Sequence, residues 1–290
     1  MRRNAIDGPR TVRLDILNPG HYFACIGLGE LASAKVPEKT LCNQFAINCE
    51  GRSYYRLDED GPTLAEVIEP FRELDAVIMP PPPLHPSSGI CREYLPWTFV
   101  RHGNLVVDWW MQFAANDKSV FKDPPSKFME DWRAAYRRYR PVRQTNYKFW
   151  AGNVTVTAKH PEVVRQVAEV LKGVSIDSEI LYSTQIRRKT LFRIDSCFMA
   201  DPMVLGSRPD KTDFHTLNSP LVDLLLAAGL QRVMPPIIDD EFVYRAWTAP
   251  VPQMLSHAAC VGDISLPHAA YRCQTVWSDY YRTTRPATGV

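Results

Sequence analysis

The sequence predicts an α+β protein, with mixed short strands and helices around two buried apolar helices and long proline-rich loops. Two helical segments, 21–34 and 221–230, lack a polar face, which is typical of helices that are buried on all sides. Short strand patterns are interspersed with helices without a regular β-α alternation, and this favours α+β over α/β. The 24 prolines among 290 residues predict long irregular connections between the elements.

The first elements follow from local patterns. Residues 11–17 alternate apolar and polar side chains and predict a half-buried strand. Asn18-Pro19 then supplies an N-cap and a proline at the first helical position, which favour a helix through 21–34. Residues 44–49 and 53–57 predict two short strands.

The next elements are a helix, an extended connection and a hairpin. Residues 63–74 place apolar side chains on one helical face. The run MPPPPLHP at 79–86 predicts an extended polyproline segment. The apolar runs 97–100 and 105–109 flank His102-Gly103-Asn104, and Gly-Asn between such runs is a hairpin signal.

The middle of the chain alternates between helical and strand patterns. Periodicity predicts helices over 126–138 and 160–172. Apolar runs predict strands over 148–157, 179–182 and 189–198.

The last third begins with a predicted loop, 200–219, which is rich in Pro, Asp and Ser. Ser219-Pro220 then opens the second apolar helix, 221–230, in the same way that Asn18-Pro19 opens the first. This likeness allows a weak internal duplication, although two ordinary core helices are the interpretation that we favour. The remaining residues predict mixed strand and loop.

These elements predict three regions. They are an N-terminal α+β region over 1–78, a basic-aromatic nucleic-acid-binding region over 87–198, and a C-terminal helix and mixed strand and loop region over 199–290; one continuous domain is the alternative. Seven cysteines, an odd number, predict reduced thiols in a cytoplasmic protein. The sequence predicts neither an export segment nor a membrane span.

A basic-aromatic stretch, WRAAYRRYRPVRQTNYK at 132–148, carries the main functional prediction. It holds six basic residues, four aromatic residues and no acid, whereas the whole chain has a formal charge of only +2. Guanidinium groups bind phosphates through paired N–H donors, and aromatic rings stack on bases. The stretch therefore predicts contact with nucleic acid through Arg133, Arg137, Arg138, Arg140, Arg143 and Lys148. The alternative is a solvated helix whose aromatic residues pack inward.

A second basic cluster follows at Arg187, Arg188 and Lys189. It predicts a second nucleic-acid contact on a strand. The alternative is an ordinary strand edge that is protected by basic residues.

Metal-dependent hydrolysis is the competing function. His257, Cys260, His268 and Cys273 have the residue types of a zinc site, and Asp213 and His215 could join a hydrolase. Their spacing differs from zinc knuckles, and the sequence lacks a nucleophile elbow or a phosphate loop. We therefore expect neither a cofactor nor catalytic residues.

Four blocks of sequence resemble a CRISPR-associated, large-subunit-like family of type I-U (I-G) Cascade interference complexes. They are NPGHYFACIGLGELA at 18–32, DWW at 108–110, KFWAGN at 148–153 and SPLVDLLLAAGLQRVMP at 219–235. The resemblance implies a subunit of an RNA-guided DNA-surveillance complex, with guide RNA, target DNA, CRISPR backbone subunits and a helicase-nuclease effector as its partners. It also implies a role in recognising the motif beside the target. None of these blocks is a catalytic signature.

Overall fold

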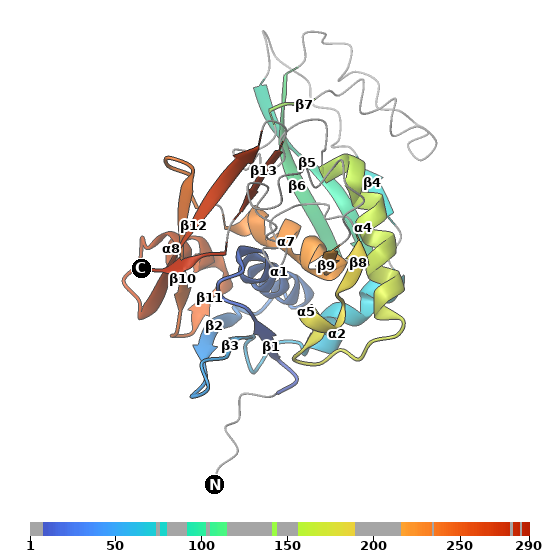
Figure 1. Ribbon diagram of the computed structural model, residues 1–290. Coiled ribbons are helices and arrows are strands. Elements are labelled where there is room, and N and C mark those ends of the chain that lie inside the picture. Colours follow the sequence, from blue (N-terminus) through green and yellow to red (C-terminus); the bar gives the residue numbers. More distant parts are fainter. Residues whose placement is uncertain are drawn as a thin grey trace.

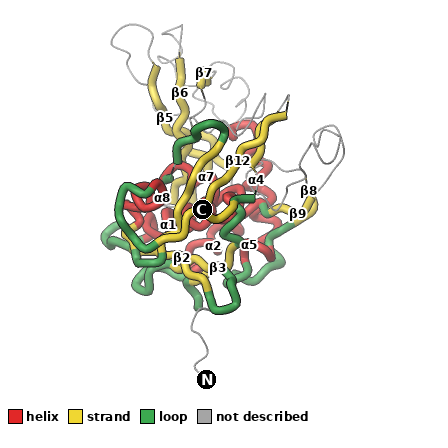
Figure 2. Tube along the Cα trace, turned by 60° about the vertical axis from the view of Figure 1, so that its left-hand side comes forward, coloured by secondary structure: helices red, strands yellow, loops and turns green. Residues whose placement is uncertain are grey.

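The chain folds as the α+β protein that the sequence predicts, in a computed structural model (Figures 1 and 2). The structure describes residues 8–73, 76–79, 92–102, 105–114, 141–143, 156–188, 216–233, 235–278, 281–284 and 286–290. Helices and small antiparallel sheets are mixed along the chain. No helix in this described part is both long and apolar enough to cross a membrane.

The element order begins with an N-terminal group and continues through a middle group. The first group is β1 (Thr11–Leu14), α1 (Pro19–Lys35), β2 (Cys42–Ile47), β3 (Ser53–Arg56), α2 (Leu64–Ile68) and the 3-10 helix η1 (Glu69–Glu73). The middle group is β4 (Ala76–Met79), β5 (Arg92–His102), β6 (Leu105–Ala114), β7 (Pro141–Arg143), α4 (Val156–Leu171), α5 (Ile180–Ser183) and β8 (Ile186–Arg188).

The C-terminal group completes the chain. It comprises β9 (Thr216–Asn218), α7 (Pro220–Arg232), β10 (Glu241–Trp247), β11 (Val251–Pro252), the 3-10 helix η4 (Gln253–Leu255), α8 (Ser256–Val261), β12 (His268–Ser278), β13 (Tyr281–Thr284) and β14 (Thr288–Gly289). The short helix α8 lies in a part of the chain for which the sequence predicts only strand and loop.

The two apolar helices are confirmed as α1 and α7. Asn18 caps α1, and its side chain accepts a hydrogen bond of 2.9 Å from the Gly20 N–H. Ser219 caps α7 by accepting a bond of 3.1 Å from the Val222 N–H. Both caps are fully buried, so each satisfies a helix N–H that water cannot reach.

The backbones of α1 and α7 touch at two glycines. A Cβ built on Gly27 would lie 1.9 Å from the carbonyl oxygen of Leu225, and one on Gly229 would lie 1.8 Å from that of Phe23. Any side chain at either glycine would therefore hold the helices apart. Figure 1 shows the two helices at the centre of the molecule, with the sheets around them.

The two helices run in the same direction. Their first turns lie beside α5, because the His21 ring contacts Tyr182 at 5.1 Å and the Ser219 hydroxyl bonds to Thr184 at 2.7 Å. Nearer their C-terminal ends the two helices are joined by an ion pair, in which Arg232 donates to both carboxylate oxygens of Glu30, at 2.5 and 2.6 Å.

The first sheet, in the order β1-β3-β2-β11, is built on a split β-α-β unit. Strand β3 pairs antiparallel with both β1 and β2, so β1 and β2 are parallel to each other with β3 between them. Helix α1 makes the connection from β1 to β2. A second sheet pairs β10, β13 and β14 with β12.

Aromatic side chains fill the space between these sheets and α1. Tyr22 of α1 stacks on Phe45 of β2 at 5.0 Å and contacts Tyr244 of β10 at 4.4 Å. Trp247 meets Phe45 edge-on, and its indole N–H donates to the carbonyl of Asn43 at 3.0 Å. One hydrophobic cluster contains residues of all three predicted regions.

A third sheet has the order β4-β5-β6-β7, and helices α4 and α7 pack against it. Strands β5 and β6 form the predicted hairpin, and they continue beyond the helices at the end of the molecule opposite the N-terminus (Figures 1 and 2). Strands β8 and β9 form a separate two-stranded sheet.

Two predicted elements are divided or shifted in the structure. The helix predicted over 63–74 changes from α2 to the 3-10 helix η1 at Glu69, because Pro70 has no N–H for an α-helical bond. The strand predicted over 148–157 is wrong at its last two residues, which begin α4; its other residues lie outside the described ranges.

Two further predictions are wrong in type. The strand predicted over 179–182 is the helical turn α5, in which the Thr184 hydroxyl donates to the Ile180 carbonyl at 2.7 Å and stabilises the end of the turn. The loop predicted over 200–219 ends in strand β9. The predicted elements at 126–138 and 189–198 lie outside the described residues, and so does the polyproline segment predicted over 79–86, apart from Met79 at the end of β4.

Candidate nucleic-acid interface

The structure describes three of the nine predicted nucleic-acid contacts, at least in their backbone. Arg143 lies in β7, and Arg187 and Arg188 lie in β8. The other six lie outside the described residues: Arg133, Arg137, Arg138, Arg140, Lys148 and Lys189.

Arg143 ends the edge strand of the third sheet. It pairs with Gln112 of β6, and Gln112 pairs with Tyr94 of β5 on its other side. Strand β7 is therefore the part of the basic-aromatic stretch that belongs to the sheet. Its Arg143 lies in one row with Gln112 and Tyr94 across three strands.

Arg187 and Arg188 belong to a different sheet. In the ribbon of β8 and β9, Arg187 pairs with Leu217, and Arg188 pairs with Thr216. Arg187 is exposed, as is Leu217, whose side chain is 59% accessible. The two predicted basic clusters thus contribute residues to separate sheets.

The β8–β9 ribbon is anchored to the core through α5. The buried hydroxyls of Thr184 and Ser219 share a hydrogen bond of 2.7 Å directly beside the two strands. Arg13 of β1 forms an ion pair of 2.8 Å with Glu179, and its guanidinium lies 4.8 Å from the centre of the Tyr182 ring. These contacts fix the position from which the Arg187 side chain leaves the core.

Arg187 differs from most of the described arginines in its ion pairing. Six arginines have carboxylate partners within 4 Å: Arg13, Arg52, Arg72, Arg165, Arg232 and Arg272. No carboxylate in the described part of the chain forms such a pair with Arg187. An exposed guanidinium of this kind has donors available to an anion.

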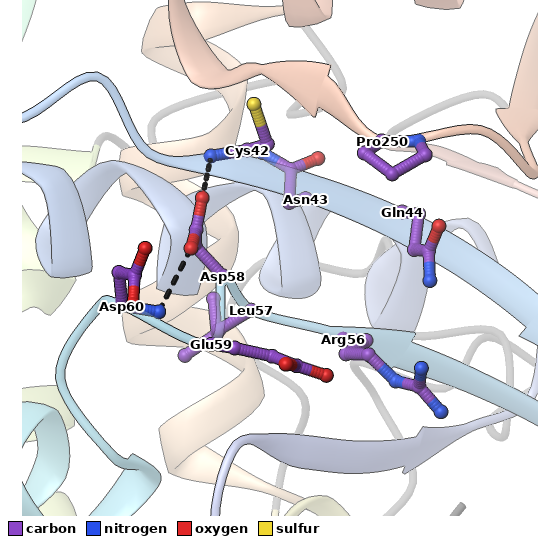
Figure 3. A pocket seen from close by; sticks show the side chains of 9 residues that line it. All are labelled: Cys42, Asn43, Gln44, Arg56, Leu57, Asp58, Glu59, Asp60 and Pro250. Atoms are coloured by element: carbon purple, nitrogen blue, oxygen red, sulfur yellow. Dashed lines mark hydrogen bonds between the residues drawn. The ribbon is translucent and has the colours of Figure 1, made fainter.

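An open cleft of about 320 Å³ lies at the first sheet, between strands β2 and β3 and the segment that precedes β11 (Figure 3). Gln44 and Arg56 lie at one end of it, and Asp58 and Asp60 lie at the other. Asp58 accepts hydrogen bonds from the backbone N–H groups of Cys42 and Asp60, at 2.7 and 2.9 Å.

The charge of this cleft does not suit a polyanion. Its lining holds three carboxylates and a single arginine, so a phosphate would meet net repulsion. The cleft is therefore a poor site for a nucleic-acid backbone. The sequence did not predict this cleft, because Pro250 is distant in sequence from Cys42 and Asp58 and lies beside them only in the folded chain.

Two described cysteines, Cys42 at the cleft and Cys260 in the core, are not activated nucleophiles. Partial burial and the nearby Asp58 carboxylate raise the pKa of the Cys42 thiol. Full burial raises the pKa of Cys260 to about 11. Reactive cysteines have a lowered pKa, so both thiols stay protonated near neutral pH.

The structure does not bring together the residues of the alternative metal site, as far as it describes them. Cys260 and Cys273 are buried, whereas His257 and His268 are exposed. His268 Nδ1 lies 2.7 Å from the Leu266 carbonyl. No three His, Cys, Asp or Glu side chains within the described ranges are grouped as metal ligands. Asp213 and His215 lie outside those ranges.

Comparisons with models of protein families, with curated proteins and with solved structures found no match for this chain. The functional argument therefore rests on the residues themselves.

Proposed function

We propose that this chain is a non-catalytic subunit of an RNA-guided CRISPR interference complex, which contacts guide RNA or target DNA through its basic-aromatic stretch. The observation that carries the proposal is the stretch 132–148, with its six basic residues and no acid. Six positive charges without an acid in the same stretch are stable when a polyanion supplies the balance.

Two features support this assignment. The resemblance of four sequence blocks to the type I-U (I-G) family indicates the kind of complex. Two of these blocks, 108–110 and 148–153, flank or overlap the basic-aromatic stretch. The thiols of Cys42 and Cys260 have raised rather than lowered pKa values, which agrees with a binding role. In this role the protein contacts backbone phosphates, while base pairing with the guide supplies sequence specificity. Recognition of the target-adjacent motif and recruitment of the helicase-nuclease belong to the same proposal.

The test is a triple substitution, R133Q/R137Q/R138Q, compared with the wild type by fluorescence anisotropy on labelled DNA and RNA. For duplex DNA we expect the slope of log K against log salt to become shallower by about 2.7, because each lost phosphate contact contributes about 0.9. R52Q/R165Q/R272Q removes three exposed, carboxylate-paired arginines and is the charge-matched control. Equal binding by the test triple and the control would refute the assigned residues.

A second experiment tests the assembly. The chain should co-purify with guide-RNA backbone subunits that are expressed together with it, and nuclease treatment should weaken that association. An assembly that survives complete nuclease digestion would instead indicate a protein scaffold. Metal-dependent cleavage of nucleic acid by the purified chain would refute the non-catalytic role.

A further inference from the structure

The β8–β9 ribbon has one face that points away from the core. Arg187 and Leu217 are directly opposite each other, and the neighbouring pair joins Ile186 to Asn218. Successive pairs alternate between the two faces of a ribbon. Asn218 is only 1% accessible, whereas Leu217 is 59% accessible and Arg187 is exposed. The pair that includes Asn218 therefore faces the protein, and Arg187 and Leu217 share the outer face.

Arg187 and Leu217 form one amphipathic pair on this outer face. The Cβ atoms of directly opposed strand residues lie about 5 Å apart, so the two side chains start side by side. Within the described part of the chain, no carboxylate forms an ion pair with the Arg187 guanidinium. A ligand of this face therefore meets a cation and an apolar group together.

Two helices hold the base of the ribbon in place. The Thr184 hydroxyl, at the end of α5, donates to the Ile180 carbonyl, so the Ser219 hydroxyl is the donor in the 2.7 Å bond between Ser219 and Thr184. Ser219 also caps α7 by accepting a hydrogen bond from Val222. Both strands thus leave the core from fixed points, and Figure 2 shows the ribbon at the margin of the molecule.

We propose that the β8–β9 ribbon binds duplex DNA from the minor groove, with Leu217 inserted between two base pairs and Arg187 bound beside it. Proteins that kink DNA in this way insert an apolar side chain as a wedge between base steps and contact the groove with arginine or lysine. The ribbon presents both parts on one face. This inference rests on the proposed function, and it adds a duplex as ligand, a contact separate from the stretch 132–148 and a role for Leu217.

The chemistry of the pair favours a duplex over a single strand. Single-strand sites stack unpaired bases on aromatic rings, and leucine has no ring for such stacking. An apolar wedge instead contacts the faces of two base pairs that it has separated. The negative potential of the minor groove attracts a guanidinium, and Arg188 and Lys189 extend the same basic run in the sequence.

The test measures how the full chain binds and bends short duplexes. Each duplex has about 20 base pairs and a fluorescent dye at each end, so that bending raises the energy transfer between the dyes. One DNA duplex has a central TA step, which is easily unstacked, and the other has a central A-tract, which is stiff. An RNA duplex of the same length is the third probe.

We expect the wild type to bend the TA duplex and to bind it about 10-fold more tightly than the A-tract duplex, because a TA step is separated at lower cost. Leu217→Ser should abolish the bend and the preference but keep part of the affinity. Leu217→Met retains an apolar wedge and should retain both. Arg187→Gln should raise the Kd for both DNA duplexes and make the slope of log K against log salt shallower by about 0.9.

The controls match these substitutions in chemistry. Leu255→Ser removes another exposed leucine, which is 43% accessible in η4. Arg52→Gln removes an exposed arginine that is paired with Glu50. Both controls should bind and bend the duplexes as the wild type does. Circular dichroism checks that each variant is folded, and the wild-type comparison of the two DNA duplexes does not depend on any variant.

The possible failures are distinguishable. If R133Q/R137Q/R138Q weakens binding while Leu217→Ser and Arg187→Gln equal their controls, the ribbon is wrong and the proposed function stands. A wild type that bends neither DNA duplex and binds both equally, or that prefers the RNA duplex, would overturn the wedge. Ribbon variants that reduce co-purification with guide-RNA backbone subunits after nuclease digestion, but not DNA binding, would identify a protein-docking surface instead. If the wild type binds no DNA and no RNA, both proposals are refuted.

Discussion

The contact between α1 and α7 makes a strong prediction for Gly229→Ala. Alanine in place of glycine within a helix normally stabilises a protein by about 0.5–1 kcal/mol. Here the new Cβ would lie 1.8 Å from the Phe23 carbonyl oxygen, whereas real Cβ atoms essentially never approach closer than 3.0 Å. The neighbour is backbone rather than a flexible side chain, so the two helices must separate by more than about 1 Å.

Overpacking in a core costs about 1–3 kcal/mol, and a rigid backbone neighbour favours the upper end of that range. After subtraction of the gain in helix propensity, we expect Gly229→Ala to lower the free energy of unfolding by about 2 kcal/mol. Gly27→Ala should cost about the same, because its Cβ would lie 1.9 Å from the Leu225 carbonyl oxygen. The double variant should cost less than the two single costs together, since one separation of the helices relieves both clashes.

Urea denaturation followed by tryptophan fluorescence measures these changes. Gly173→Ala is the control, because a Cβ there meets nothing within 4 Å. Its unfolding free energy should stay within about 0.5 kcal/mol of the wild type. A Gly229→Ala protein at least as stable as the wild type would refute the helix contact.

Three further predictions concern stability. Arg232→Gln should cost about 1–2 kcal/mol in urea unfolding, because Glu30 loses two charge-assisted hydrogen bonds in a partly buried site, and added salt should reduce this difference. Asp239→Gly should raise stability by about 0.5 kcal/mol, because Asp239 has a φ of 50° in a tight turn; an unchanged or lower melting temperature would contradict this. The pKa of Cys260 rises on folding from 9.0 to about 11. The buried, protonated thiol therefore contributes fully to the free energy of unfolding below pH 9, and this contribution is lost as the pH rises toward 11. Cys260→Ala should therefore reduce the alkaline fall of the unfolding free energy by up to about 1.4 kcal/mol per pH unit, and an unchanged slope would contradict the assignment.

Local chemistry determined which parts of the fold the sequence could predict. Asn18-Pro19 and Ser219-Pro220 each combine a cap with a proline, and both helices begin where these pairs predict. The run at 179–182 was ambiguous because a short apolar segment suits a strand or a helical turn equally. The hydrogen bond from Thr184 to Ile180 and the contact with Ser219 favour the turn, and only the folded chain supplies Ser219.

The candidate site was predictable to a smaller extent. Charge density alone identified the stretch 132–148 and the cluster at Arg187, because basic residues without acids are visible in any window. Apart from the β5–β6 hairpin, the sequence could not predict which strand lies beside which. Arg143 joins a row with Gln112 and Tyr94 only because β7 pairs with β6 some 30 residues earlier in the chain, and non-local pairing has no local signal.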